Sequence, residues 1–136
     1  MDTKSERILD TCDWRLVSLF TEVDKHLLFS IGTNGGHRTS HMQFKLWMQG
    51  RSLQDGEWIA IGDTVTNCDG VARISKHQHY PSKAVDVWIK PLDWDDISKW
   101  KAFVLQVYEI AEMLGIKVKN LGQSIGDWPH WEVVDG

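Results

Sequence analysis

The sequence contains little cysteine and little proline. Its 136 residues include two cysteines, Cys12 and Cys68, and neither lies in a CxxC pair. We therefore expect free thiols and no disulfide framework. The three prolines are scattered, and no stretch rich in proline, glycine and serine divides the chain. The sequence thus predicts one domain over residues 1–136 with a single core.

Long apolar runs are also absent. Hydrophobic residues make up 42% of the chain, which is enough for a core and argues against disorder. A membrane-spanning helix needs about 20 consecutive apolar residues, and no such run occurs, so we expect no membrane partner. The first ten residues, MDTKSERILD, carry charges where a signal peptide has its apolar centre, so we expect the protein to start in the cytoplasm.

The chain lacks an excess of positive charge. Lysine and arginine number 15 against 19 aspartate and glutamate residues, which gives a formal net charge of -4. Proteins that bind DNA or RNA normally concentrate lysine and arginine on one surface, because they must neutralise phosphates. The composition therefore argues against a nucleic-acid partner.

Apolar spacing predicts three helices. Apolar side chains recur every three or four residues over 5–28, which predicts one amphipathic helix there. A shorter helix is expected over 39–49, with Thr39 as N-cap and Gly50 as stop. The longest helix is expected to begin in the acidic run 93–96 and to end at Gly115.

Short β-rich segments alternate with these helices. The clearest is AVDVWI over 84–89, where the two-residue period places Asp86 and Trp88 on one face. Further strands are expected at 27–31, 116–121 and 130–134, and the polar segment 51–79 is expected to form loop and hairpin. The mixture predicts an α+β domain.

Three polar residues need an explanation: His77, Asp86 within an apolar strand, and His130. Two imidazoles and one carboxylate are the ligand set of a catalytic zinc site that keeps one position open for water. A buried histidine or aspartate is, however, more often satisfied by ordinary hydrogen bonds. Glu132, two residues after His130, either orients that histidine or faces solvent.

The segments around these residues occur in a recognisable order. They are Ser-Lys-His at 75–77, PSKAVD at 81–86, DWDD at 93–96 before a long helix, and DWPHWE at 127–132. This order resembles the zinc peptidases of peptidoglycan stem peptides, which include D-Ala-D-Ala dipeptidases and carboxypeptidases and the L-alanyl-D-glutamate endopeptidases. GHRT at 36–39, followed by Gln43, is similar to the endopeptidase branch. The resemblance covers residues 35–134.

The resemblance implies a fold and a site. The fold would be hedgehog/DD-peptidase-like, a small antiparallel sheet packed against helices. The ligands of a Zn²⁺ ion would be His77, Asp86 and His130, and Asp127 would be the catalytic carboxylate that moves the water proton. Arg38 would stabilise the oxyanion or bind a substrate carboxylate.

The sequence departs from the family pattern in two places. In the family the first histidine usually precedes the aspartate by seven residues, the separation of His79 from Asp86, whereas His77 precedes it by nine. We prefer His77 because it follows Ser-Lys and because a related form of the motif, with Pro-Ser before the AVD, has two more residues. His79 is the alternative. The segment before Asp127 is also shorter than in many relatives, which leaves substrate preference open.

The expected function is therefore a zinc-dependent peptidoglycan hydrolase that cleaves the stem peptide at the L-Ala–D-Glu bond. The small size and the absence of a signal peptide suit a phage endolysin, so we expect a monomer in the host cytoplasm that is released to the cell wall during lysis. Two alternatives stay open. One is a D-Ala-D-Ala carboxypeptidase of the same family, and the other is a non-catalytic hedgehog-like module that keeps the zinc site.

The eight tryptophans have two expected uses. We expect three of them to anchor the core, namely Trp47, Trp94 and Trp100. Two others flank His130 and are expected to line the site, namely Trp128 and Trp131. A carbohydrate-binding stripe is the weaker interpretation, because aromatic residues of small domains mostly fill cores.

Overall fold

A four-stranded antiparallel sheet forms the centre of the computed structural model, which describes residues 1–135. Each pair of neighbouring strands is antiparallel. The strand order is β1 (Phe29–Ile31), β4 (Ala84–Ile89), β6 (Asp127–Val133) and β5 (Val118–Leu121). The predicted α+β class with an antiparallel sheet packed against helices is therefore confirmed.

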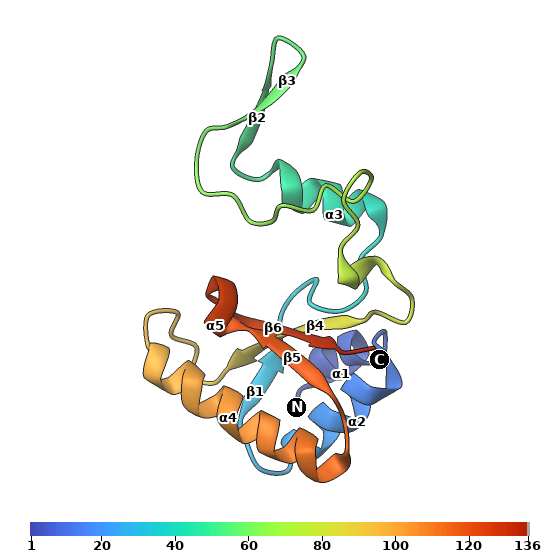
Figure 1. Ribbon diagram of the computed structural model, residues 1–136, viewed down its shortest axis with the longest axis vertical. Coiled ribbons are helices and arrows are strands. Elements are labelled where there is room, and N and C mark those ends of the chain that lie inside the picture. The colour runs from blue at the N-terminus through green and yellow to red at the C-terminus, as the bar shows by residue number, and fades with distance from the viewer. Residues whose placement is uncertain (136) are drawn as a thin grey trace.

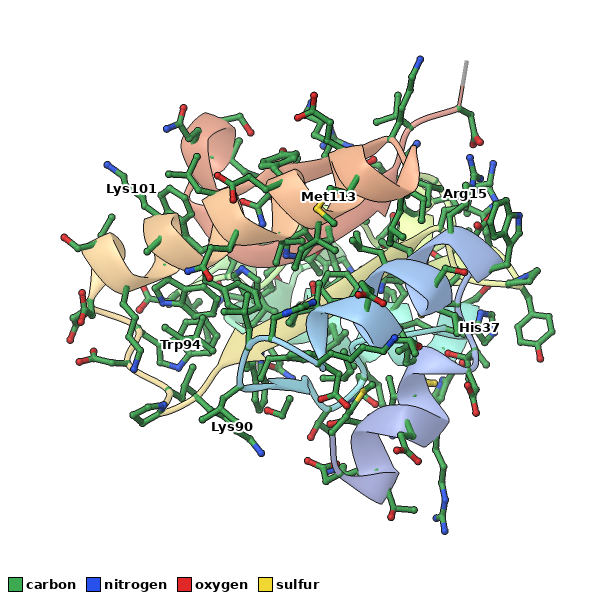
Figure 2. All side chains as sticks on the ribbon, turned by 90° about the horizontal axis from the view of Figure 1, so that it is seen from below. Arg15, His37, Lys90, Trp94, Lys101 and Met113 are labelled. Carbon is green, nitrogen blue, oxygen red and sulfur yellow. The ribbon has the colours of Figure 1, made fainter. Side chains whose placement is uncertain are left out.

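Helices cover one face of this sheet, as Figures 1 and 2 show. They are α1 (Thr3–Leu9), α2 (Trp14–Val23) and α4 (Ile97–Leu114). The core between the layers contains Val85 and Val87 of β4 and Trp131 of β6, all fully buried. The Trp131 ring meets Phe20 and Tyr108 edge-on, with centroids 6.0 Å and 5.1 Å apart. Because side chains alternate along a strand, the other face of β4 and β6 carries Asp86 and His130.

An arm leaves the body between β1 and β4 and projects away from it, on the side opposite the helices α1, α2 and α4 (Figure 1). It comprises α3 (Ser40–Met48), β2 (Arg51–Gln54), β3 (Glu57–Ala60) and the 3₁₀ helix η1 (Lys76–Gln78). Aromatic rings hold the hairpin against α3, since the ring centroid of Trp58 in β3 lies 6.0 Å from that of Phe44 and 5.2 Å from that of Trp47. The predicted hairpin and the N-cap at Thr39 are confirmed.

The prediction of one continuous helix over 5–28 is wrong, because the chain forms two helices there. The Asp13 side chain accepts a hydrogen bond from the Arg15 N–H and caps α2. The residues between the helices bond to Ser82, whose carbonyl accepts from the Asp13 N–H and whose N–H donates to the Thr11 carbonyl, both at 2.8 Å. The spacing of apolar residues continues across this break, so the break cannot be predicted from that spacing.

Two further boundaries differ from expectation. The long helix begins at Ile97 and not in the run 93–96, because Asp96 is its N-cap and accepts from the Lys99 N–H. The strand expected over 130–134 begins earlier, at Asp127. A single helical turn that the sequence did not predict, α5 (Gly122–Ile125), precedes it.

The tryptophan expectations are confirmed only in part. Trp100 is buried, but Trp94 is 52% exposed because it lies in the loop before α4 and not on the helix. Trp47 anchors the small aromatic cluster of the arm and does not belong to the main core. Trp131 fills the core and does not line the site, since it points to the helical face of β6.

Both cysteines are free thiols, as expected. Burial raises the pKa of Cys12 to about 12, so this thiol stays protonated at neutral pH. Among residues 1–135, no helix combines the length and the apolar character needed to cross a membrane.

Candidate metal centre

His77 is placed by the short helix η1. Ser75 and Gln78 form a capping box there, in which the Ser75 hydroxyl accepts from the His77 N–H and the Gln78 side chain accepts from the Ser75 N–H. The His77 side chain is 2% exposed. Its Nδ1 lies 2.9 Å from the Gly36 carbonyl, which can only accept, so Nδ1 carries the proton. A side chain at Gly36 would collide with Thr11, because an added Cβ would lie 2.5 Å from the Thr11 Oγ1.

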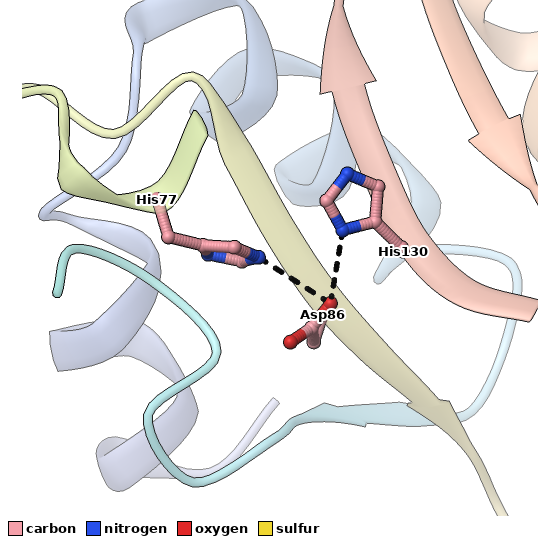
Figure 3. A group of neighbouring side chains, drawn as sticks. All are labelled: His77, Asp86 and His130. Atoms are coloured by element: carbon pink, nitrogen blue, oxygen red, sulfur yellow. Dashed lines mark ion pairs between the residues drawn. The ribbon is translucent and has the colours of Figure 1, made fainter. Parts of the chain in front are cut away.

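Asp86 and His130 face each other on neighbouring strands. They are paired in the register of β4 and β6, on the face opposite the one that packs against the helices. Figure 3 shows the Oδ1 of Asp86 between the two imidazoles, 3.6 Å from the His77 Nε2 and 3.5 Å from the His130 Nδ1. Residues separated by up to 53 positions in the sequence thus meet at one carboxylate oxygen.

The three side chains fit a divalent cation. The His77 Nε2 is buried and makes no hydrogen bond within residues 1–135. When the ring carries its proton on Nδ1, Nε2 directs a lone pair at a carboxylate oxygen of Asp86. This contact is unfavourable unless a proton or a metal ion lies between the two atoms. The donor atoms of His77, Asp86 and His130 all lie within 4.8 Å of one another. Tetrahedral ligands held about 2.0–2.1 Å from one zinc ion are about 3.3–3.5 Å apart, close to the spacings seen here.

Glu132 faces the site and not solvent. Its Oε1 lies 3.3 Å from the His130 Nε2, and its Oε2 lies 3.5 Å from the Lys76 Nζ. The hydrogen bond with His130 is the main reason that the pKa of Glu132 is lowered. Metal-binding histidines usually donate their second ring N–H to such a carboxylate, which fixes the tautomer and turns the other nitrogen to the metal. Glu132 therefore directs the His130 Nδ1 towards Asp86.

Arg38 is fixed by three acceptors. Its Nη2 donates to the Asp86 Oδ2 at 2.9 Å, its Nη1 to the Gln43 Oε1 at 3.1 Å and its Nε to the Asn34 carbonyl at 2.7 Å. Burial lowers the pKa of Arg38, and the charge of Asp86 opposes this effect. The contact occupies the second oxygen of Asp86, so that Oδ1 is the oxygen that meets the histidines.

Asp127 lies at the open side of this group. Its Oδ2 is 4.0 Å from the His130 Nδ1, and 44% of its side chain is exposed. Partial burial raises the pKa of Asp127, and the nearby charge of Asp86 raises it further. A carboxyl group that gives and takes protons near neutral pH needs such a raised pKa.

The comparisons with known proteins identify the fold. No protein-family model and no curated protein sequence matches this chain. A solved structure does match, that of the Serratia marcescens L-Ala D-Glu endopeptidase ChiX, with a TM-score of 0.68 and 20% sequence identity over 98% of this chain and 89% of that chain. The chain has the ChiX endopeptidase fold. The fold expected from the sequence resemblance is thereby confirmed, and the His-Asp-His group lies within it.

Charge in this endopeptidase fold is concentrated around Asp86. Burial opposes ionisation of Asp86, but His77, His130 and Arg38 together outweigh it and hold the pKa of this carboxyl far below its usual range. Burial also disfavours protonated His130, yet Asp86 and Glu132 outweigh it and raise the pKa of His130 to about 9. A metal ion at this site must therefore displace a proton.

Gln43 supports the site from α3. The side chain is completely buried, accepts from Arg38 and donates through Nε2 to the Cys68 carbonyl at 2.9 Å. It thus ties Arg38 to the segment that returns from the hairpin. The sequence resemblance pointed to this glutamine. Its burial could not be predicted from the local sequence, because its partner Cys68 lies 25 residues away.

His79, the alternative first ligand, lies outside the group. It is exposed, and its backbone carbonyl accepts from the His37 Nδ1 at 3.0 Å. Because η1 turns the chain after Ser75, the structure places His77 beside Asp86. The geometry therefore favours the preferred assignment.

Proposed function

We propose that this chain is a zinc-dependent peptidoglycan hydrolase of the stem-peptide peptidase family, and that it cleaves the L-Ala–D-Glu bond. The observation that carries the proposal is the buried, unpaired His77 Nε2, which converges with Asp86 and His130 in a chain that has the fold of an L-Ala D-Glu endopeptidase. A metal ion would accept the lone pair of this nitrogen, which has no hydrogen-bond partner within residues 1–135.

His77, Asp86 and His130 would hold the ion as three protein ligands and leave one position open, the arrangement of catalytic zinc sites. When bound, zinc supplies Lewis acidity and lowers the pKa of water to about 7. Asp127 takes the proton of the attacking water and returns it to the departing amine. Its partial exposure and raised pKa support both steps.

Arg38 has two roles in this proposal. It positions Asp86 through the 2.9 Å contact to Oδ2. The guanidinium also has more N–H donors than its three contacts use. Since it lies against a metal ligand, a remaining N–H is available to the oxyanion of the substrate carbonyl. In the biological setting, we propose a phage endolysin that reaches the wall when the host lyses.

Mass spectrometry of purified peptidoglycan fragments tests the function directly. Fragments are incubated with zinc-loaded protein, with a chelated sample and with zinc-loaded Asp127→Asn; Asp55→Asn, at the exposed hairpin turn, is the matched control. We expect a new free amino terminus on D-Glu with the wild type and Asp55→Asn only. Release of terminal D-Ala would replace the endopeptidase assignment with the carboxypeptidase alternative. Unchanged fragments would reject hydrolysis and favour the non-catalytic module.

A further inference from the structure

Trp88 shares the face of β4 that carries Asp86. It lies two residues beyond Asp86, and side chains two apart on a strand point the same way. A strand rises about 3.3 Å per residue, so the two positions are about 7 Å apart. The Trp88 ring lies against the Gly32 backbone, where an added Cβ would be 2.8 Å from the Trp88 Cε2. Trp88 is thus an aromatic neighbour of the metal centre and does not belong to the main core.

Trp94 extends this aromatic surface outwards. Its ring meets that of Trp88 at 6.1 Å between centroids and stacks on Trp100 at 5.5 Å. Trp100 is only 1% exposed, whereas Trp94 is 52% exposed. Figure 2 shows Trp94 at the N-terminal end of α4. The three rings therefore form a continuous path from the core to the surface beside β4.

Resting on the proposed function, we propose that Trp88 and Trp94 form a subsite for the N-acetylmuramoyl sugar ring that bears the stem peptide. In peptidoglycan the L-Ala residue is joined to this sugar through a lactyl group. L-Ala and the lactyl group together are about two residues long, and an extended chain spans about 3.3–3.6 Å per residue. The sugar ring therefore lies about 7 Å from the scissile carbonyl, a length comparable to the rise of about 7 Å along β4 between the backbone positions of Asp86 and Trp88.

The surface has the chemistry that a sugar needs. Pyranose C–H groups carry partial positive charge, and the face of an indole ring is negative. Trp94 is held before the ligand arrives, because it stacks on Trp100 and the Trp100 Nε1 donates to the Asp93 carbonyl at 3.0 Å. Such preorganisation lowers the entropic cost of binding. The exposed carboxylate of Asp95 beside Trp94 is an acceptor for sugar hydroxyls.

A binding comparison tests the subsite. N-acetylmuramoyl-L-alanine and N-(D-lactoyl)-L-alanine, which differ only in the sugar ring, are titrated calorimetrically into the zinc-loaded full chain. We expect the sugar to tighten binding about three- to tenfold, and Trp94→Ala to abolish the difference while Trp94→Phe keeps part of it. Trp14→Ala on α2 and Trp58→Ala on the arm are matched controls for loss of an exposed tryptophan, and both should retain the difference. Thermal unfolding and zinc content confirm that each variant folds.

Equal affinity of the wild type for both ligands would overturn the subsite, as would a sugar effect that persists in Trp94→Ala or disappears in Trp58→Ala. Cleavage of a sugar-free L-Ala–D-Glu peptide is measured in parallel. Cleavage without a sugar preference would leave the proposed function standing and reject the subsite. A Trp94-dependent sugar preference without cleavage would support the subsite and reject the proposed function.

Discussion

The Nε2 of His77 faces the Oδ1 of Asp86 at 3.6 Å and forms no hydrogen bond within residues 1–135. Both atoms are lone-pair donors when the Nδ1 of His77 bonds to the Gly36 carbonyl. This pair is the strongest sign of a metal ion in the molecule, since a cation between the two atoms removes their repulsion and satisfies both.

Loss of the His77 imidazole should therefore abolish tight metal binding. We expect His77→Ala to weaken zinc affinity by more than about 100-fold, because even outer partners of metal ligands contribute about 10- to 100-fold. His79→Ala removes an exposed imidazole from the same loop and should bind zinc like the wild type. Competition with a chromophoric chelator measures both. If His79→Ala lost zinc affinity and His77→Ala kept it, His79 would be the ligand.

Removal of the Asp127 carboxylate should separate catalysis from metal binding. Asp127 is not within the three-residue ligand group, so Asp127→Asn should keep its zinc content and its thermal stability. Turnover should fall by about 10²–10⁴-fold, the usual contribution of a general base. Steady-state hydrolysis of an L-Ala–D-Glu peptide and metal analysis of the same sample test this. Unchanged turnover would reject Asp127 as the base.

The sequence predicted the elements that local chemistry specifies. The alternation in 84–89 predicted β4 and placed Asp86 on the face opposite the core valines, because a two-residue period needs no distant contact. Thr39 caps the start of α3 and Gly115 caps the end of α4, where capping preferences put them. The three candidate ligands came from motif order, and the fold brings them within ligand distance of one another.

Features that depend on distant contacts were beyond local patterns. The break between α1 and α2 depends on hydrogen bonds to Ser82, and the Nδ1 of His77 is bonded to a carbonyl 41 residues earlier. Trp94 looked like a core residue because it lies next to a strong helix, yet the helix begins after it. Arg38 was expected to act on substrate alone, but in the fold its Nη2 donates a hydrogen bond to Asp86.

Metal binding should depend on pH through His130. The pKa of His130 is raised to about 9 in the metal-free protein, so the imidazole is protonated at pH 7. Only the neutral ring binds a metal, so each ion must displace this proton, and affinity should rise about tenfold per pH unit until pH reaches about 9. Calorimetric titrations with zinc in buffers of different ionisation enthalpy count the released protons. His41 is exposed, so the control variant His41→Ala should release as many protons on zinc binding as the wild type. Affinity that stays constant from pH 6 to 8 would contradict a protonated His130.

Gln43 should stabilise both the fold and the position of Arg38. Gln43→Leu replaces the amide with an apolar side chain of similar size and leaves the Arg38 Nη1 without an acceptor and the Cys68 carbonyl without a donor. A buried polar group that loses its partner costs about 1–3 kcal/mol, so the free energy of unfolding in urea should fall by at least that much. Gln49→Leu changes an exposed glutamine just after the same helix and should stay within about 0.5 kcal/mol of the wild type. Hydrolysis should also slow in Gln43→Leu at constant zinc content, because Arg38 then holds Asp86 less firmly. If both glutamine variants unfold like the wild type, Gln43 does not hold Arg38 in solution.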